Sequence, residues 1–185
     1  MSDLIRTLHD FAALFDRLQV PYAIMGGWAV RMYGLPRPTY DVDFTIAIER
    51  ERLPDLYDTA TDMGFTVPEQ FMAGWVDTVA GMPLVKFRLY LIDRGIDVDV
   101  FLAESEYQQE LMRRRRSHDL DGQRIWFVSP EDLILLKVVA ARPRDLGDIE
   151  DVMLAQVDLD EAYMRRWAKE LGVAEKLEEV LASRP

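Results

Sequence analysis

The stretch that decides the fold is residues 22–48, YAIMGGWAVRMYGLPRPTYDVDFTIAI. It begins with an apolar run of strand character, turns at Gly26 and Gly27, continues as a short helix, and passes through a proline-rich loop into a second strand. That second strand opens with Asp41 and Asp43. Because the side chains of a strand alternate between its two faces, we expect both carboxylates on the same face of a sheet, within reach of one cation.

Working outward from this stretch, the residue patterns predict an α/β (α+β) protein with a mixed sheet flanked by helices. Residues 68–83 fit either a loop or a hairpin because two glycines and a proline interrupt them, and residues 93–95 have the composition of a hairpin turn. The expected strands are 22–25, 44–48, 65–67, 84–92, 96–102 and 125–128, and the expected helices are 3–18, 28–33, 50–63, 105–117, 130–141, 145–155, 159–171 and 173–182.

The character of the chain changes at Ser129, which is a typical helix N-cap followed by a proline at the first helical position. We therefore expect two parts without a flexible linker between them. Residues 1–128 would form the α/β core with an N-terminal helix, and residues 129–185 would form a helical region packed on that core.

Composition narrows the class of protein. The chain has 185 residues, no cysteine and a net charge of −11, which excludes disulfides and thiolate metal sites. No apolar run is long enough to span a membrane, and the acidic, amphipathic N-terminus is unlike a signal peptide, so we expect a cytoplasmic protein without a membrane partner. Strong acidity disfavours non-specific nucleic-acid binding. Residues 113–116 are four consecutive arginines, which could bind phosphate or could simply be a solvated helix end.

A second pair of acids stands in the expected strand IDVDVFL, at Asp97 and Asp99. Acids within an apolar strand are costly to bury unless they are paired or bound to metal, and clustered carboxylates repel one another. A divalent cation removes this cost, and Mg²⁺ favours a few carboxylates together with substrate phosphate oxygens. Asp41 and Asp43, with Asp99 or Asp97 as the third carboxylate, could therefore hold one or two Mg²⁺ ions.

The glycine pair suggests a phosphate site beside these acids. Glycine allows close backbone approach, and the N–H groups at the start of the following helix can bind phosphate. Arg37 and Thr39, just before the acids, could contact a triphosphate. Taken alone, without the acids, Gly26 and Gly27 fit an ordinary strand-to-helix turn better than a phosphate site.

Together these motifs resemble the polymerase β-type nucleotidyltransferase superfamily. GGWAVRMYGLPRPTYDVDF resembles its glycine motif and Asp-x-Asp, and IDVDVFLAESEY offers the third Asp. The form RPTYDVD resembles the AbiEii-like toxin nucleotidyltransferases and the small antibiotic nucleotidyltransferases, and SPEDLILLKVVAARPRDLGDIEDV resembles a C-terminal motif of the AbiEii-like group. The resemblance covers residues 22–152, with 68–95 poorly matched, and it implies the polymerase β-like fold.

The resemblance also implies roles for individual residues. Gly26 and Gly27 would contact the nucleotide phosphates. Asp41 and Asp43 would bind both metal ions. Asp99 would be the third metal ligand and the base for the acceptor hydroxyl, since the Val-Phe-Leu after it fits the family context better than the residues after Asp97.

Two residues of the helical region complete the expected site. Lys137 would be a catalytic residue that binds phosphate or the acceptor, and Asp148 would belong to the nucleotide-binding set by orienting that lysine. The alternative is that Lys137 pairs structurally and that Asp148 pairs with Arg142 or Arg144. The chain departs from the superfamily at Gly27, where many members have a serine, so one phosphate contact is absent.

The implied activity is Mg²⁺-dependent transfer of NMP from an NTP such as ATP to an acceptor hydroxyl. A toxin-like enzyme would modify tRNA or protein and have a cognate antitoxin partner. The alternatives are an antibiotic nucleotidyltransferase of the aminoglycoside or lincosamide kind, with a small-molecule acceptor, and a non-catalytic nucleotide-binding module on the same fold.

Overall fold

The computed structural model describes residues 2–92 and 94–183, so Asp93 of the expected hairpin turn lies outside the described residues. The helices are α1 (Ser2–Arg17), α2 (Gly26–Tyr33), α3 (Leu53–Asp62), α4 (Glu69–Met72), α5 (Glu106–Arg114), α6 (Pro130–Ala140), α7 (Asp145–Ala155), α8 (Glu161–Glu170) and α9 (Ala174–Ala182), with a 3₁₀ turn η1 (Arg50–Arg52) before α3. The strands are β1 (Tyr22–Ile24), β2 (Asp41–Ile46), β3 (Asp77–Val79), β4 (Met82–Tyr90), β5 (Gly95–Leu102), β6 (Arg116–Leu120) and β7 (Gln123–Phe127).

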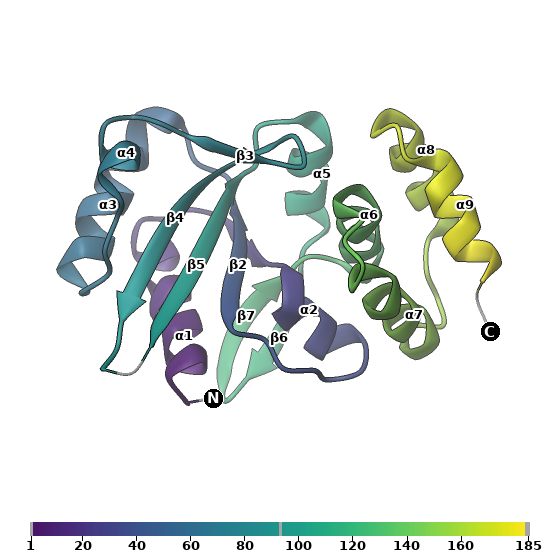
Figure 1. Cartoon of the computed structure of the whole chain (residues 1–185), viewed down its shortest axis with the longest axis horizontal. Helices are drawn as coiled ribbons and strands as arrows, with labels where there is room; N and C mark the ends of the chain where they lie inside the picture. The colour runs from purple at the N-terminus through teal and green to yellow at the C-terminus, as the bar shows by residue number, and fades with distance from the viewer. Residues whose placement is uncertain (1, 93, 184–185) are drawn as a thin grey trace.

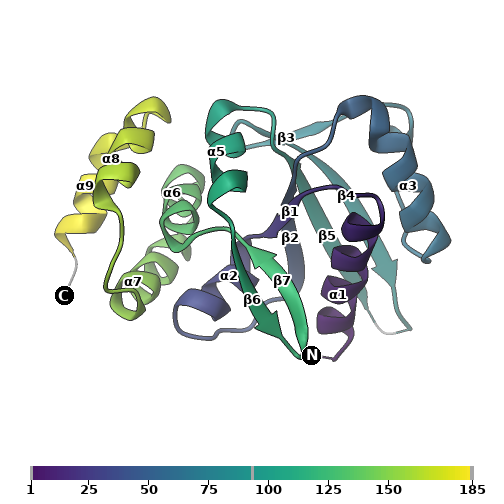
Figure 2. The same cartoon turned by 180° about the vertical axis from the view of Figure 1, so that it is seen from behind.

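The strands described in these ranges form one mixed sheet in the order β3-β4-β5-β2-β1-β7-β6 (Figures 1 and 2). Its centre is the pairing of β2 with β5, which run parallel, while β1 pairs antiparallel with β2. In the β2–β5 register Asp41 lies opposite Asp97, and Asp43 lies opposite Asp99. Because residues paired across two strands point to the same face, all four acids are on one face of the sheet.

The other face of the sheet is apolar and is covered by α1. Phe11 of α1 packs against Phe44 of β2 with ring centroids 5.8 Å apart, and against Phe87 of β4 at 5.2 Å. Helix α1 lies behind the sheet in Figure 1 and in front of it in Figure 2. The alternation of Asp-Val-Asp-Phe in β2 therefore decides which face is core and which carries the acids, which lie on the side of α2.

The helical region lies beside this acidic face. Every residue from Pro130 to Val138 in α6 is buried, and α6 contacts α2 as well as the helices α7, α8 and α9 that follow it. Figure 1 shows α7, α8 and α9 stacked at one end of the molecule, outside α6. None of the helices described in 2–92 and 94–183 is long and apolar enough to cross a membrane.

The expected fold class is confirmed, and most helices and strands lie close to their expected ranges. The expected helix 105–117 is wrong at its end, because α5 stops at Arg114 and β6 begins at Arg116. The ambiguous residues 68–83 hold α4, β3 and the start of β4, whereas the expected strand at 65–67 is reduced to a single bridge between Thr66 and Arg88. Strand β6 was not predicted from local propensity, because it depends on pairing with β7 and on the ion pair of Arg116 with Glu131.

The run of four arginines at 113–116 is engaged within the structure. Each arginine has an acidic or aromatic partner, and these partners come from α5, β7, α6 and α8. The contacts are Arg113 with Glu110, Arg114 with Glu131 and the ring of Tyr163, Arg115 with the ring of Trp126, and Arg116 with Glu131. The run thus joins the core to the helical region, and it does not present four free cations to a nucleic acid.

Candidate functional site

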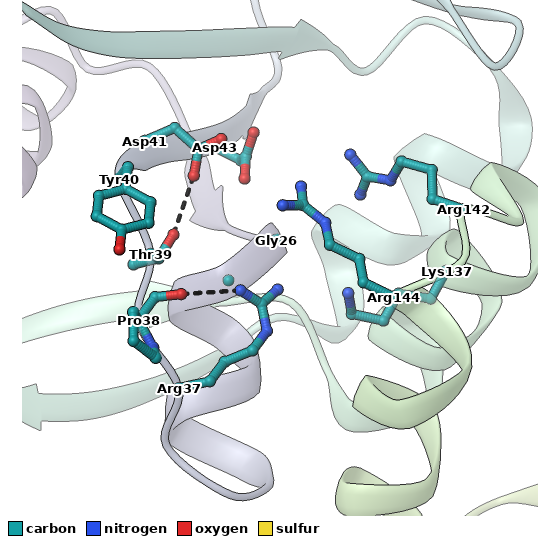
Figure 3. Close-up of a pocket in the computed structure, with 11 residues that line it drawn as sticks. Gly26, Arg37, Pro38, Thr39, Tyr40, Asp41, Asp43, Lys137, Arg142 and Arg144 are labelled. Atoms are coloured by element: carbon teal, nitrogen blue, oxygen red, sulfur yellow. Dashed lines mark hydrogen bonds between the residues drawn. The ribbon is translucent and has the colours of Figure 1, made fainter.

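A polar pocket lies where the N-terminus of α2, the start of β2 and the end of α6 meet (Figure 3). Asp41 and Asp43 stand on one side of it, and basic side chains from α6 and the segment after it stand on the other. The lining residues are Gly26, Gly27, Arg37, Pro38, Thr39, Tyr40, Asp41, Asp43, Lys137, Arg142 and Arg144. The structure therefore brings together seven of the residues that the sequence singled out.

Asp43 is the most electrostatically strained group in this pocket. Its side chain is partly buried, and it makes no hydrogen bond or ion pair with another residue described in the structure. Burial, together with the neighbouring carboxylates of Asp41 and Asp99, raises the pKa of Asp43 from its ordinary 3.8 to about 7. The charged form of this carboxylate would be stabilised by a nearby cation, and no described side chain forms an ion pair with it.

Asp99 lies in one pocket with Asp41 and Asp43, and Asp97 does not line that pocket. Asp99 lines a second pocket that shares Asp41 and Asp43 with the first, and its side chain is 27% exposed. Burial raises the pKa of Asp99, and Lys86, whose Nζ lies 3.4 Å from Oδ2, partly offsets this. Asp97 is 56% exposed and faces Arg88 at 3.4 Å. The register of β5 therefore gives the two acids different surroundings.

The donor set fits a divalent cation in part. Among residues 2–92 and 94–183, no three His, Cys, Asp or Glu side chains are gathered closely enough to hold a metal ion as they stand. The unpaired carboxylate of Asp43 and the adjacent Asp41 are nevertheless hard oxygen donors of the kind that Mg²⁺ prefers. They fit an ion that takes its remaining ligands from water and substrate.

Close packing explains why both glycines stand at the start of α2. Gly26 has φ +61°, and a Cβ there would lie 1.8 Å from Oδ2 of Asp43. A Cβ on Gly27 would lie 2.6 Å from Oγ1 of Thr39, which donates a 2.9 Å hydrogen bond to Asp41. The pair is thus the first turn of α2 itself, where the expected helix began at 28, and it lets the acids and Thr39 approach the helix N-terminus.

The basic side of the pocket is held by a chain of ion pairs. Arg37 donates two hydrogen bonds to Asp148, at 2.5 and 2.8 Å. Lys137, 3% exposed, lies 2.5 Å from Asp148 and 3.1 Å from Asp145, which also pairs with Arg142 at 3.0 Å. Burial raises the pKa of Asp148, but Arg37 and Lys137 outweigh it and lower that pKa below its usual value. Asp148 therefore pairs with Arg37 and Lys137, and not with Arg142 or Arg144.

Sequence reasoning missed that Arg142 and Arg144 line the pocket. Ala141 ends α6 in the left-handed region at φ 49°, and this reverses the chain so that both arginines face the acids. Within the described part of the chain, the Arg144 guanidinium has no hydrogen-bonded or ion-paired partner. The sequence signal was the ARPRD segment directly after an apolar helix.

The mixed sheet carries paired acids beside a helix N-terminus that begins with two glycines, and a helical region closes the pocket. This is the polymerase β-like nucleotidyltransferase fold. The chain belongs to the family described as "Nucleotidyltransferase of unknown function (DUF6036)", whose model matches residues 2–179. None of the curated protein sequences matches this chain.

Solved structures agree with this fold. An antigenic nucleotidyltransferase-like protein from Paracoccidioides brasiliensis has a TM-score of 0.61 at 19% identity, over 99% of this chain and 94% of that chain. The antibiotic-resistance factor ANT(2'')-Ia has a TM-score of 0.55 at 21% identity, over 98% and 91%. The lincosamide antibiotic adenylyltransferase LnuA has a TM-score of 0.52 at 15% identity, over 82% and 97%. At such identities the likeness concerns the fold alone.

Proposed function

We propose that this protein transfers a nucleoside monophosphate from an NTP to an acceptor hydroxyl in a Mg²⁺-dependent reaction. The observation that carries the proposal is Asp43, an unpaired, partly buried carboxylate beside Asp41 that faces a pocket rich in cations. Without a cation, this unpaired carboxylate lowers the stability of the free protein. Its charge becomes favourable once a metal-bound triphosphate occupies the pocket.

The residues around the pocket suit this substrate. Asp41 and Asp43 would hold the metal, and Asp99 would join them as the third ligand. When bound, Mg²⁺ would neutralise phosphate charge and orient the reacting groups. The N–H groups at the start of α2 would bind phosphate oxygens. The Thr39 hydroxyl next to Gly27 would turn from Asp41 to donate to a phosphate oxygen as well, so Thr39 would supply the contact that a serine at position 27 makes elsewhere.

Basic residues would bind the rest of the triphosphate. Arg144 has a guanidinium without a described partner and Arg142 is partly exposed, so both can turn toward phosphate oxygens. Lys137 and Arg37 are held by the buried Asp148, so their role would be to fix the wall of the pocket and supply positive potential. Catalysis would then come mostly from positioning and charge neutralisation.

Asp99 would act as the base. Its raised pKa and its place in the second pocket, next to Asp41 and Asp43, suit a group that accepts the proton of the acceptor hydroxyl. The hydroxyl oxygen would attack the α-phosphorus, and the bond from that phosphorus to the β-phosphate bridging oxygen would break. Pyrophosphate would leave with that electron pair.

The decisive experiment is a thermal-shift screen of the four NTPs with and without Mg²⁺, on wild type, Asp43→Asn and Asp97→Asn. We expect NTP with Mg²⁺ to stabilise wild type and the Asp97 variant and to leave the Asp43 variant unchanged. Equal stabilisation of all three proteins would refute the proposed site. Label transfer from NTP to total tRNA, lysate protein and an antibiotic panel then identifies the acceptor.

Two kinds of acceptor follow from different observations. The toxin-like hypothesis, with tRNA or protein as acceptor and an antitoxin partner, rests on the sequence motifs. The arginines at 113–116 no longer support it, because they are engaged within the structure and are not free to bind RNA phosphates. Two relatives in fold are described as acting on or binding small antibiotics, namely adenylyl-2''-tobramycin in ANT(2'')-Ia and lincomycin in LnuA. They favour a small-molecule acceptor. A non-catalytic module is disfavoured because all three carboxylates are retained.

A further inference from the structure

A second pocket of about 410 Å³ opens on the far side of Asp41 and Asp43 from the basic pocket. Its walls are apolar side chains from the β3–β4 hairpin, the end of β5 and one face of α6. The wall residues that matter here are Val79, Met82, Phe101, Leu133, Leu136 and Val139. A volume of this size is typical of sites for small ligands.

Charged groups gather on the side of this apolar pocket that adjoins the basic one. Asp41, Asp43, Lys137 and Arg142 line both pockets, and Asp99 lines the apolar pocket beside them. The proposed metal ion would use all three acids, and Lys137 is already paired with Asp145 and Asp148. Arg142 pairs with Asp145 and would bind the triphosphate, so no other charged side chain along the described walls of the pocket is left to recognise a charged ligand.

We propose that this apolar pocket binds the acceptor, and that the acceptor is a neutral small molecule that carries a hydroxyl beside an apolar face. The proposal rests on the proposed nucleotidyl transfer and deepens it. The apolar face would lie between Met82 of β4 and Val139 of α6, which places the hydroxyl at Asp99. That hydroxyl would lose its proton to Asp99 as its oxygen bonds to the α-phosphorus and pyrophosphate leaves.

The other kinds of acceptor fit this pocket less well. A polycationic amino sugar needs acids beyond those used by the metal, and the described lining offers none. RNA needs a track of cations for its phosphates, but residues 113–116 are engaged with acidic and aromatic partners. Against an apolar wall, in contrast, binding becomes more favourable with each apolar group of the ligand that is removed from water.

The test uses phenyl β-glucoside as a neutral acceptor with an apolar group, glucose as its polar match, a polycationic amino sugar, and total tRNA. Each is added to the protein with a non-hydrolysable NTP analogue and Mg²⁺ for thermal shift, and with labelled NTP for transfer. Two variants fill the pocket from partly exposed positions of α6, Val139→Trp and Ala140→Trp. The matched control is Leu154→Trp, because Leu154 is 65% exposed on α7, away from both pockets.

We expect phenyl β-glucoside to raise the Tm of wild type and the Leu154 variant by about 3 °C beyond the analogue alone when it is well above its Kd, and to be labelled. Glucose should give less than about a third of that shift. Both α6 variants should keep the analogue-dependent shift and lose the shift due to the glucoside, with KM for transfer raised about tenfold or more. Having two filling variants guards against one that does not fold.

Three results would overturn the inference. One is transfer to the amino sugar or tRNA without binding or labelling of the glucoside. Another is equal shifts with the glucoside in the Leu154 and Val139 variants. The last is loss of the analogue-dependent shift in both α6 variants, which would assign the apolar pocket to the nucleobase. Failure of the proposed function would look different from all of these. NTP with Mg²⁺ would then not stabilise wild type more than the Asp43→Asn variant.

Discussion

Replacing Asp43 with Asn should stabilise the metal-free protein at neutral and alkaline pH, although it should abolish function. Burial and two neighbouring carboxylates raise the pKa of Asp43 from 3.8 to about 7. That is about 3 units, or about 4 kcal/mol at ~1.4 kcal/mol per unit, an upper bound for a fully buried group. Because the side chain is only partly buried, solvent screening reduces this, and we expect about 2 kcal/mol.

The pH dependence gives this prediction its sign. Well below pH 3.8 the carboxyl of Asp43 is neutral in the folded and unfolded states, and at pH 4 only a small part of the difference has developed, so wild type and the Asn variant should have similar stability there. Between pH 4 and pH 7 the unfolded state loses its proton first, so wild type loses stability as the pH rises. The gain of the variant should therefore be less than half complete at pH 5 and complete at pH 8.

The assay is urea denaturation in EDTA at pH 4, 5 and 8, with Asp97→Asn as the matched control. Asp97 is 56% exposed on the same face of the sheet, so its replacement should change the free energy of unfolding by less than about 0.5 kcal/mol. Addition of NTP and Mg²⁺ should reverse the order of wild type and the Asp43 variant. The reasoning is refuted if the Asp43 variant is no more stable than wild type at pH 8, or if its gain at pH 4 is as large as at pH 8.

Three further substitutions test the parts around Asp43. Gly26→Ala should displace the Asp43 carboxylate and remove the thermal shift with NTP and Mg²⁺. The control is Gly74→Ala, because Gly74 has a positive φ but open space around it. That variant should lose only about 1 kcal/mol of unfolding free energy in urea and keep the thermal shift. Lys137→Met should lower the free energy of unfolding by about 3–5 kcal/mol, because two buried carboxylates lose their shared cation; a cost below about 1 kcal/mol would contradict the ion-pair geometry. Arg114→Ala should cost about 2 kcal/mol and Arg113→Ala less than about 0.5 kcal/mol, and equal Tm values for the two variants would show that the arginine run has no structural role.

Local patterns were enough to predict the architecture around the acids. The alternation in DVDFTI places Asp41 and Asp43 on one face and Phe44 on the other, and the 3–4 spacing of α1 supplies the apolar stripe that covers Phe44. These features depend on the geometry of single helices and strands. Elements that depend on contacts with distant parts of the chain were missed, and β6 is the clearest case. It pairs with β7, and Arg116 at its start forms an ion pair with Glu131 of α6.

The sequence by itself determined the fold class, the two aligned acids of β2 and the glycine pair before them, since each follows from local periodicity and backbone freedom. Only the tertiary structure showed that Asp99 lines a pocket with Asp41 and Asp43 while Asp97 is more exposed beside Arg88, because this depends on the register of β5 against β2 and on what covers each acid. It also decided that Arg142 and Arg144, which a left-handed turn at Ala141 aims at the acids, face the open pocket, while Lys137 is held by Asp148. These outcomes depend on which side chains long-range packing brings within a few ångströms, and spacing along the chain does not carry that information.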